Sequence, residues 1–283
     1  MKDPAESIAE ESKRFWEREW LWWHRIAPPL RPAAQDIGML VRLVAQWCNS
    51  RGYERPAALL LGVTPEIACM RWPGGTKLVA VDRSRGMIDN IWPRNAFDDA
   101  GVLQGMWTAL PVADGSCDIA TGDGCFSQLS YPQGYVDLTN ELARVLKRGG
   151  LFAMRAFVRP QPAESVQDLL SEMKAGRIGS FHVFKWRLNM ALQPHTAAGV
   201  RLHDVWTTFM ELFGDPATLA SQTNWPFEDV ETIHAYRNVN ARYTFPTLSE
   251  LRGKLSARFG IIACEFPDYE MGERCPTLLF ETL

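Results

Sequence analysis

Short apolar runs alternate with helical patterns between residues 56 and 157, and this alternation limits the possible folds more than any other feature of the sequence. Such alternation with short turns predicts a parallel sheet with right-handed connections and helices on both faces. Two apolar runs near the carboxyl end, joined by a polar turn, predict a closing antiparallel pair. We therefore expect a doubly wound α/β fold with a mostly parallel seven-stranded sheet, its strands at residues 57–63, 77–82, 101–105, 117–121, 151–157, 260–266 and 277–281.

Residues 1–56 precede the alternating region and are expected to form a helical leader. Ser7 and Glu10 have capping-box spacing for a first helix that Pro28 ends, and a second helix fits 36–47. Five of the eleven tryptophans of the chain lie before residue 50. Aromatic residues at helical spacing usually pack a helix against the main body, but some of these tryptophans could also form a lid over a ligand.

Residues 158–246 interrupt the alternation and are expected to form a helical cap inserted after the fifth strand. Ser180 is a hydroxyl residue suited to cap a helix over 181–192. Residues 57–157 and 247–283 then make up the sheet domain. Within it, the apolar spacing predicts a helix over 135–147, with Gly149 as its C-cap.

The charge balance and the cysteines exclude several classes of protein. The chain has 30 basic and 33 acidic residues, so a nucleic acid or an anionic membrane is not an expected partner. The amino terminus is acidic and polar rather than signal-like, and the apolar run 57–63 is far shorter than the ~20 residues of a membrane helix. The six cysteines form no C-x-x-C pair, which predicts reduced thiols, no zinc site and a cytoplasmic protein. The sequence indicates no oligomeric state.

Asp82 is the residue whose position is most informative. It ends the second predicted strand, twenty residues beyond Gly62. An acid at that place in a βαβ unit accepts hydrogen bonds from the hydroxyl groups of a ribose. The alternative is a surface carboxylate that caps a turn with Arg83 or Ser84.

Five sequence blocks resemble the class I S-adenosylmethionine-dependent methyltransferases. The blocks Gly-Ser-Cys-Asp-Ile-Ala and Glu-Leu-Ala-Arg-Val-Leu-Lys-Arg-Gly-Gly-Leu, at 115–120 and 141–151, are the most specific. The others are Leu-Leu-Leu-Gly-Val-Thr-Pro-Glu at 59–66, Val-Ala-Val-Asp-Arg-Ser at 79–84 and Gly-Met-Trp-Thr-Ala-Leu-Pro at 105–111. The resemblance covers about residues 57–157, returns in the last two strands, and implies a Rossmann-like fold with S-adenosylmethionine as cofactor.

The resemblance assigns roles to particular positions around the cofactor. It implies that the turn after the first strand borders the methionine part, that Asp82 holds the ribose, and that the loop after the fourth strand lies beside the sulfonium. The implied cofactor-binding residues are Gly62, Thr64, Glu66, Asp82, Arg83, Met87, Met106, Trp107, Gly122, Asp123 and Cys125. The chain departs from the family where Thr64 and Glu66 replace glycines, and where Met106 replaces the acid that often meets the adenine amino group.

The acceptor side is less defined by sequence. Methyl transfer needs a general base only if the nucleophile must lose a proton. The preferred candidate is His182, with His195, His203, His234 and Asp123 as alternatives. Arg155, at the end of the fifth strand, is the preferred substrate anchor, ahead of Arg159. The cap also carries a cationic cluster, either an anion site for a carboxylate or phosphate or a solvated helix face: Lys174, Arg177, Lys185 and Arg187.

The expected function is methyl transfer to an oxygen or nitrogen atom of a small-molecule acceptor. A catalytically silent fold, serving as a partner subunit or ligand sensor, is the first alternative because the glycine turn is altered. A nicotinamide-dependent oxidoreductase is the second, but Gly62-Val-Thr-Pro-Glu-Ile lacks the required G-x-G-x-x-G pattern. No tyrosine is followed four residues later by lysine, as short-chain reductases require.

Overall fold

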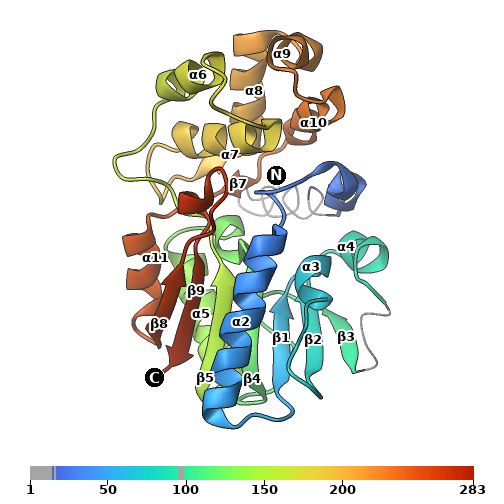
Figure 1. The fold of residues 1–283 in the computed structure, drawn as a ribbon, viewed down its shortest axis with the longest axis vertical. Helices are drawn as coiled ribbons and strands as arrows, with labels where there is room; N and C mark the ends of the chain where they lie inside the picture. Colours follow the sequence, from blue (N-terminus) through green and yellow to red (C-terminus); the bar gives the residue numbers. More distant parts are fainter. Residues whose placement is uncertain (1–14, 16, 95–98) are drawn as a thin grey trace, which may run out of the picture.

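A seven-stranded sheet forms the centre of the molecule in the computed structural model, which describes residues 15, 17–94 and 99–283 (Figure 1). Its strand order is β3-β2-β1-β4-β5-β9-β8. Of these seven strands, β9 is the one that runs in the direction opposite to the other six. The expected α/β fold with a mostly parallel seven-stranded sheet is thereby confirmed. The strands are β1 Ala57–Leu61, β2 Lys77–Asp82, β3 Ala100–Gln104, β4 Cys117–Asp123, β5 Leu146–Arg155, β8 Phe259–Glu265 and β9 Thr277–Thr282.

The first strand shows why the apolar runs are continuous rather than alternating. Leu59 and Leu60 are both completely buried, and successive residues of β1 enter different hydrophobic cores on the two faces of the sheet. Both faces are covered by helices, as expected for parallel strands. One layer contains α2 Ala34–Arg51, α3 Pro65–Ala68 and α4 Arg85–Asn90, and the other contains α5 Gln133–Val145 and α11 Leu248–Leu255 (Figure 1).

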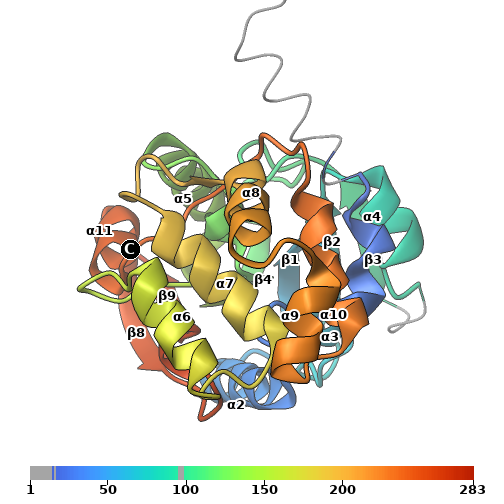
Figure 2. The ribbon, with the colours of Figure 1, turned by 90° about the horizontal axis from the view of Figure 1, so that it is seen from above.

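The segment after β5 forms helices over the carboxyl ends of the strands, and we call this segment the cap (Figures 1 and 2). Its core is aromatic, with Phe181, Phe184 and Phe209 fully buried. The hydroxyl of Ser180 accepts a hydrogen bond from the amide of Val183 and caps α7, as predicted. The elements are α6 Val166–Lys174, α7 Phe181–Leu192, β6 Val200–Arg201, α8 Leu202–Phe213, α9 Pro216–Thr223, α10 Phe227–Glu231, η4 Thr232–Tyr236 and β7 Arg242–Tyr243.

The leader lies between the cap and the sheet domain (Figure 1). Its second predicted helix is present as α2, whereas the first is only partly described, because residues 1–14 and 16 lie outside the described part. Residues 17–27 form two short 3-10 turns, η1 Glu19–Leu21 and η2 Trp23–Arg25, rather than one continuous helix. Arg25 pairs with Glu231 of the cap at 2.7 Å, and Arg31 pairs with Glu66 of the sheet domain at 2.6 Å. The short turns thus let the leader contact both domains.

Three further sequence predictions can be compared with the structure. Gly149 is not the C-cap of α5, because the helix ends at Val145 and Leu146 is already extended; Gly149 instead adopts a φ of +70° within β5. All six cysteines are free. Among the described residues, no helix has both the length and the apolar character that crossing a membrane requires.

Candidate active site

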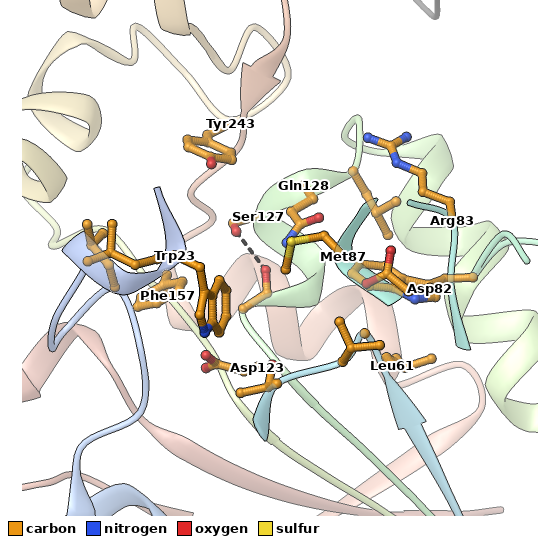
Figure 3. A pocket seen from close by; sticks show the side chains of 18 of the residues that line it. Trp23, Leu61, Asp82, Arg83, Met87, Asp123, Ser127, Gln128, Phe157 and Tyr243 are labelled. Carbon is orange, nitrogen blue, oxygen red and sulfur yellow. Dashed lines mark hydrogen bonds between the residues drawn. The ribbon is translucent and has the colours of Figure 1, made fainter. Parts of the chain in front are cut away.

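A pocket opens at the carboxyl ends of β1, β2 and β4, below the cap and beside the leader (Figure 3). The sheet order reverses between β1 and β4, and ligands of open α/β sheets bind at this kind of switch point. Three separate parts of the chain line the pocket. The strand ends contribute Asp82 and Asp123, the leader contributes Trp22 and Trp23, and the cap contributes Lys185, Trp186, Tyr236 and Tyr243.

The turn after β1 brings the main chain to the edge of the pocket. Gly62 has a φ of +91°, and its N–H donates a hydrogen bond to the carbonyl oxygen of Val81 at 2.8 Å. A Cβ atom at this position would fill space 3.5 Å from the Trp107 ring and 3.8 Å from Oδ2 of Asp82. Thr64 also lines the pocket, and its side chain makes no capping hydrogen bond to α3. The turn therefore exposes main chain where a ligand can approach closely.

Asp82 lies at the end of β2 and lines the pocket (Figure 3). Its Oδ1 accepts a hydrogen bond from the Ser84 amide at 2.8 Å, so the carboxylate does cap the following turn. Its Oδ2 is the oxygen nearest to the space beside Gly62. Burial raises the pKa of Asp82 to about 6, against a smaller lowering by the Ser84 hydrogen bond and Arg83. The capping role and a ligand-binding role are thus compatible.

Four more predicted residues line the same side of the pocket. Trp107 is fixed by a hydrogen bond from its Nε1 to the carbonyl oxygen of Val81 at 2.7 Å. Met87 is buried, whereas Met106 remains half exposed. Burial lowers the pKa of Arg83, which also lines the pocket and is close to Asp82. These four residues therefore line one common pocket.

Asp123 is the last residue of β4, and its carboxylate is held by a residue outside the pocket lining. Both of its oxygens accept hydrogen bonds from Arg155, at 2.6 Å to Nε and 3.0 Å to Nη2. Nη1 of Arg155 lies 3.3 Å from both Asp36 and the Tyr269 hydroxyl, and that hydroxyl donates to Asp36. The Arg155 side chain is only 4% exposed and does not line the pocket. We therefore correct its expected role from anchoring a substrate to positioning Asp123.

Several predicted residues lie outside the pocket lining. Glu66 faces Arg31 instead. A Cβ at Gly122 would lie 3.2 Å from the Leu61 side chain, so this glycine serves the packing of β1 against β4. Cys125 is fully buried, and burial raises the pKa of its thiol to about 12. These three residues are close to the pocket residues in sequence, but they contact other parts of the structure instead of lining the pocket.

His182, the preferred general base, is also outside the pocket lining. It is 1% exposed, and its Nε2 lies 3.6 Å from Asp229. Burial, together with the charge of Lys185, lowers its pKa to about 3, so the imidazole stays neutral. No histidine is among the described residues that line the pocket, which also removes His195, His203 and His234 from contact with a ligand there. The position of His182 in the sequence does not show which side of α7 faces the pocket. The sequence alone was therefore not sufficient to identify a general base.

Sequence reasoning missed the residues that close the pocket from above. The sequence pattern places Lys185 only in a cationic cluster and gives no indication of a role for Trp186, Tyr236 or Tyr243, although all four residues line the pocket. The high tryptophan content was the available signal for Trp23, whose indole covers the pocket next to Asp123 (Figure 3). Within the described ranges, no group of three histidine, cysteine or acidic side chains could hold a metal ion.

A seven-stranded sheet of this order, with a pocket at its switch point, defines the chain as a Rossmann-like α/β protein. Residues 61–154 match the family model described as "Methyltransferase domain", and these residues include the last residue of β1, all of β2 and β4, and the turns that follow these three strands. Residues 61–154 are thus similar to a methyltransferase domain, in agreement with the resemblance found in the sequence.

Solved structures share this fold at low sequence identity. The N-methyltransferase NodS from Bradyrhizobium japonicum, in complex with S-adenosylhomocysteine, has a TM-score of 0.53 at 9% identity, over 96% of this chain and 98% of that one. The 1,6-didemethyltoxoflavin-N1-methyltransferase from Burkholderia thailandensis has 0.52 at 12%, over 100% and 91%. A protein from Rhodobacter sphaeroides described as a putative zinc-dependent alcohol dehydrogenase has 0.59 at 11%, over 96% and 98%. No curated protein matches the sequence.

Proposed function

We propose that the protein transfers the methyl group of S-adenosylmethionine to an oxygen or nitrogen atom of a small-molecule acceptor. The observation that carries this proposal is Asp82, an acid at the end of β2 that faces a pocket at the switch point of a methyltransferase domain. The space beside Gly62, which a Cβ would fill, suits a ligand held between Asp82 and Trp107. Two methyltransferases of similar fold were solved with S-adenosylhomocysteine, which supports the same cofactor here.

The residues of the pocket divide the work between binding and positioning. Asp82 would accept hydrogen bonds from the ribose hydroxyls, and Trp107 and Met87 would border the adenine. When bound, S-adenosylmethionine supplies a sulfonium methyl group that is already activated for displacement. The cap and leader would exclude water and hold the acceptor atom in line at about 3–3.5 Å, since orientation supplies most of the catalysis in such a reaction.

Titration calorimetry with S-adenosylmethionine and S-adenosylhomocysteine tests the proposal, with NADH as the negative control. We expect both adenosyl compounds to bind and NADH not to bind. Asp82→Ala should weaken both affinities by roughly 10- to 100-fold, because the ribose loses hydrogen bonds to a carboxylate. Asp99→Ala changes an exposed acid in the turn immediately before β3; this variant is the matched control and should leave binding unchanged. Unchanged affinity in Asp82→Ala would contradict the ribose contact.

Binding alone does not separate an enzyme from the silent alternative. A screen with methyl-labelled S-adenosylmethionine and a panel of phenols, amines and carboxylates addresses this point. Transfer of label to any of them would exclude the silent fold, and tight binding without transfer to any of them would support it.

A further inference from the structure

The cationic cluster of the cap separates into two exposed residues, one largely buried ion pair and one pocket residue. Arg177 pairs with Glu172 at 2.6 Å on the surface, and Arg187 donates to Glu164. Lys174 is exposed. Lys185 differs from these three, because it is 3% exposed and lines the pocket. The sequence left two interpretations of this cluster open, an anion site or a solvated helix face. Of the four residues, Lys185 is the one whose position suits an anion site.

Lys185 lies in an aromatic environment. Its Nζ donates a hydrogen bond to the Thr232 hydroxyl at 2.9 Å and lies 5.4 Å from the centre of the Tyr236 ring and 5.6 Å from that of Phe181. The charge of Asp229 acts on Lys185, but Asp229 does not line the pocket. Because an ammonium ion loses much of its hydration when buried, an anionic oxygen arriving in the pocket would interact strongly with it.

The walls near Lys185 are flat and apolar. The Trp186 ring packs edge-to-face against Phe157 and Tyr243, with ring centres 5.0 and 5.1 Å apart. Trp23 of the leader lies beside Phe157 in the same pocket (Figure 3). Among the described residues that the leader and cap contribute to the lining, Lys185 is the only one with a charged side chain at neutral pH. A pocket with such walls favours a ligand with a planar ring, because this ring can stack on the aromatic side chains or pack edge-to-face against them.

We infer that the acceptor is a planar aromatic molecule with an anionic oxygen, a carboxylate or a phenolate, and that Lys185 binds this oxygen. The inference rests on the proposed methyl transfer and adds the chemical class of the acceptor. An acceptor that is already anionic also agrees with a described lining that contains no histidine to remove a proton.

Calorimetry in the presence of saturating S-adenosylhomocysteine tests the inference with matched probes. We expect 4-hydroxybenzoate to bind at least about tenfold more tightly than the neutral 4-hydroxybenzamide. It should also bind more tightly than cyclohexanecarboxylate, which has the charge without the planar ring. 4-Nitrophenol, measured below and above its own pKa, reports whether a phenolate is accepted like a carboxylate. Equal affinity for the benzoate and the benzamide, or no binding of either, would overturn the inference without any variant.

Variants of α7 and α6 assign the preference to Lys185. Lys185→Met should abolish the preference for the benzoate, and Lys185→Arg should retain most of it. Lys174→Met, an exposed lysine of the same cap, should behave like the natural protein. Persistence of the preference in Lys185→Met would overturn the inference, as would a loss of S-adenosylhomocysteine affinity in that variant, since Lys185 would then serve the cofactor carboxylate.

The two proposals fail in different ways. Absence of adenosyl binding, with the benzoate preference still dependent on Lys185 in the ligand-free protein, would contradict the proposed methyl transfer alone. Normal adenosyl binding with no benzoate preference would contradict only the assignment of the acceptor class.

Discussion

Two opposing influences act on the protonation state of the Asp82 carboxyl group: burial and ligand binding. In the ligand-free protein, burial favours its neutral form and raises its pKa from 3.8 to about 6. To accept hydrogen bonds from two ribose hydroxyls through both of its oxygens, it must be ionised. The same side chain should therefore make both folding stability and cofactor affinity depend on pH, in opposite directions.

We predict that the affinity for S-adenosylhomocysteine rises with pH up to about 6 and is constant above it. Over the same interval, from about pH 4 to 6, this carboxyl binds a proton in the folded state but not in the unfolded state. Its contribution to the free energy of unfolding should therefore fall as the pH increases. Calorimetric titrations between pH 5 and 8 measure the affinity, with Asp82→Asn as the non-ionising control. An identical pH profile in Asp82→Asn would refute the assignment.

Sequence reasoning at the residue scale worked where the position in a strand determines the surroundings. Asp82 ends a parallel strand, and such an end faces the crevice whatever the rest of the chain does. Arg155 also ends a strand, yet its guanidinium turns away from the pocket toward Asp36 and Tyr269, which are more than a hundred residues away in sequence. A single sequence contains no local signal for partners at that distance.

At the scale of elements, four segments meet at one buried guanidinium. Arg155 ends β5, Asp123 ends β4, Asp36 is in the first turn of α2, and Tyr269 is in the loop between β8 and β9. Burial raises the pKa of Asp36, and the charge of Arg155 opposes that effect. The network therefore holds Asp123 in place by joining the leader helix α2 to the ends of β4 and β5 and to the loop between β8 and β9.

Arg155→Met should lower the free energy of unfolding by about 3–5 kcal/mol, because it leaves two buried carboxylates without their counter-charge. Urea unfolding measures this loss. Arg155→Lys restores the charge without the paired geometry and should recover part of it. Arg177→Met removes an exposed pair with Glu172 that solvent screens, and it should have little effect on the free energy of unfolding. Equal effects of Arg155→Met and Arg177→Met would contradict a structural role for the network.

The sheet and the helices α2, α5 and α7 could be predicted from the sequence, whereas the orientation of the cap helices could not. Strand periodicity and caps are local, so β2 and the antiparallel pair β8 and β9 lie within about a residue of their expected bounds. In α7 almost every residue is buried, among them Lys185 and His182, because the helix is surrounded on several sides. A helix of this kind has no polar face to indicate its direction, and the sequence therefore ranked His182 above Lys185.

At the scale of the molecule, the pocket exists only where leader, sheet domain and cap meet. A ligand that contacts all three parts binds the folded, closed state and stabilises it by mass action. We predict that S-adenosylhomocysteine at about 100 times its Kd stabilises the protein by about 2.7 kcal/mol, or roughly 5–10 °C in melting temperature. Hydrogen exchange should slow in leader residues 17–31 as well as at the strand ends. NADH should cause neither effect, and stabilisation without slower exchange in the leader would contradict its role as a wall.

The two ion pairs of the leader also differ in a way that affects the order of events in a catalytic cycle. Its contact with the cap, Arg25 to Glu231, is largely exposed, whereas its contact with the sheet domain, Arg31 to Glu66, is more buried and is supported by stacking of Arg31 on Trp23. Exposed pairs contribute less than buried, stacked ones. The ion pair with the cap should therefore break more readily than the ion pair with the sheet domain. The acceptor side would then open first, so the methylated product would leave while S-adenosylhomocysteine is still bound.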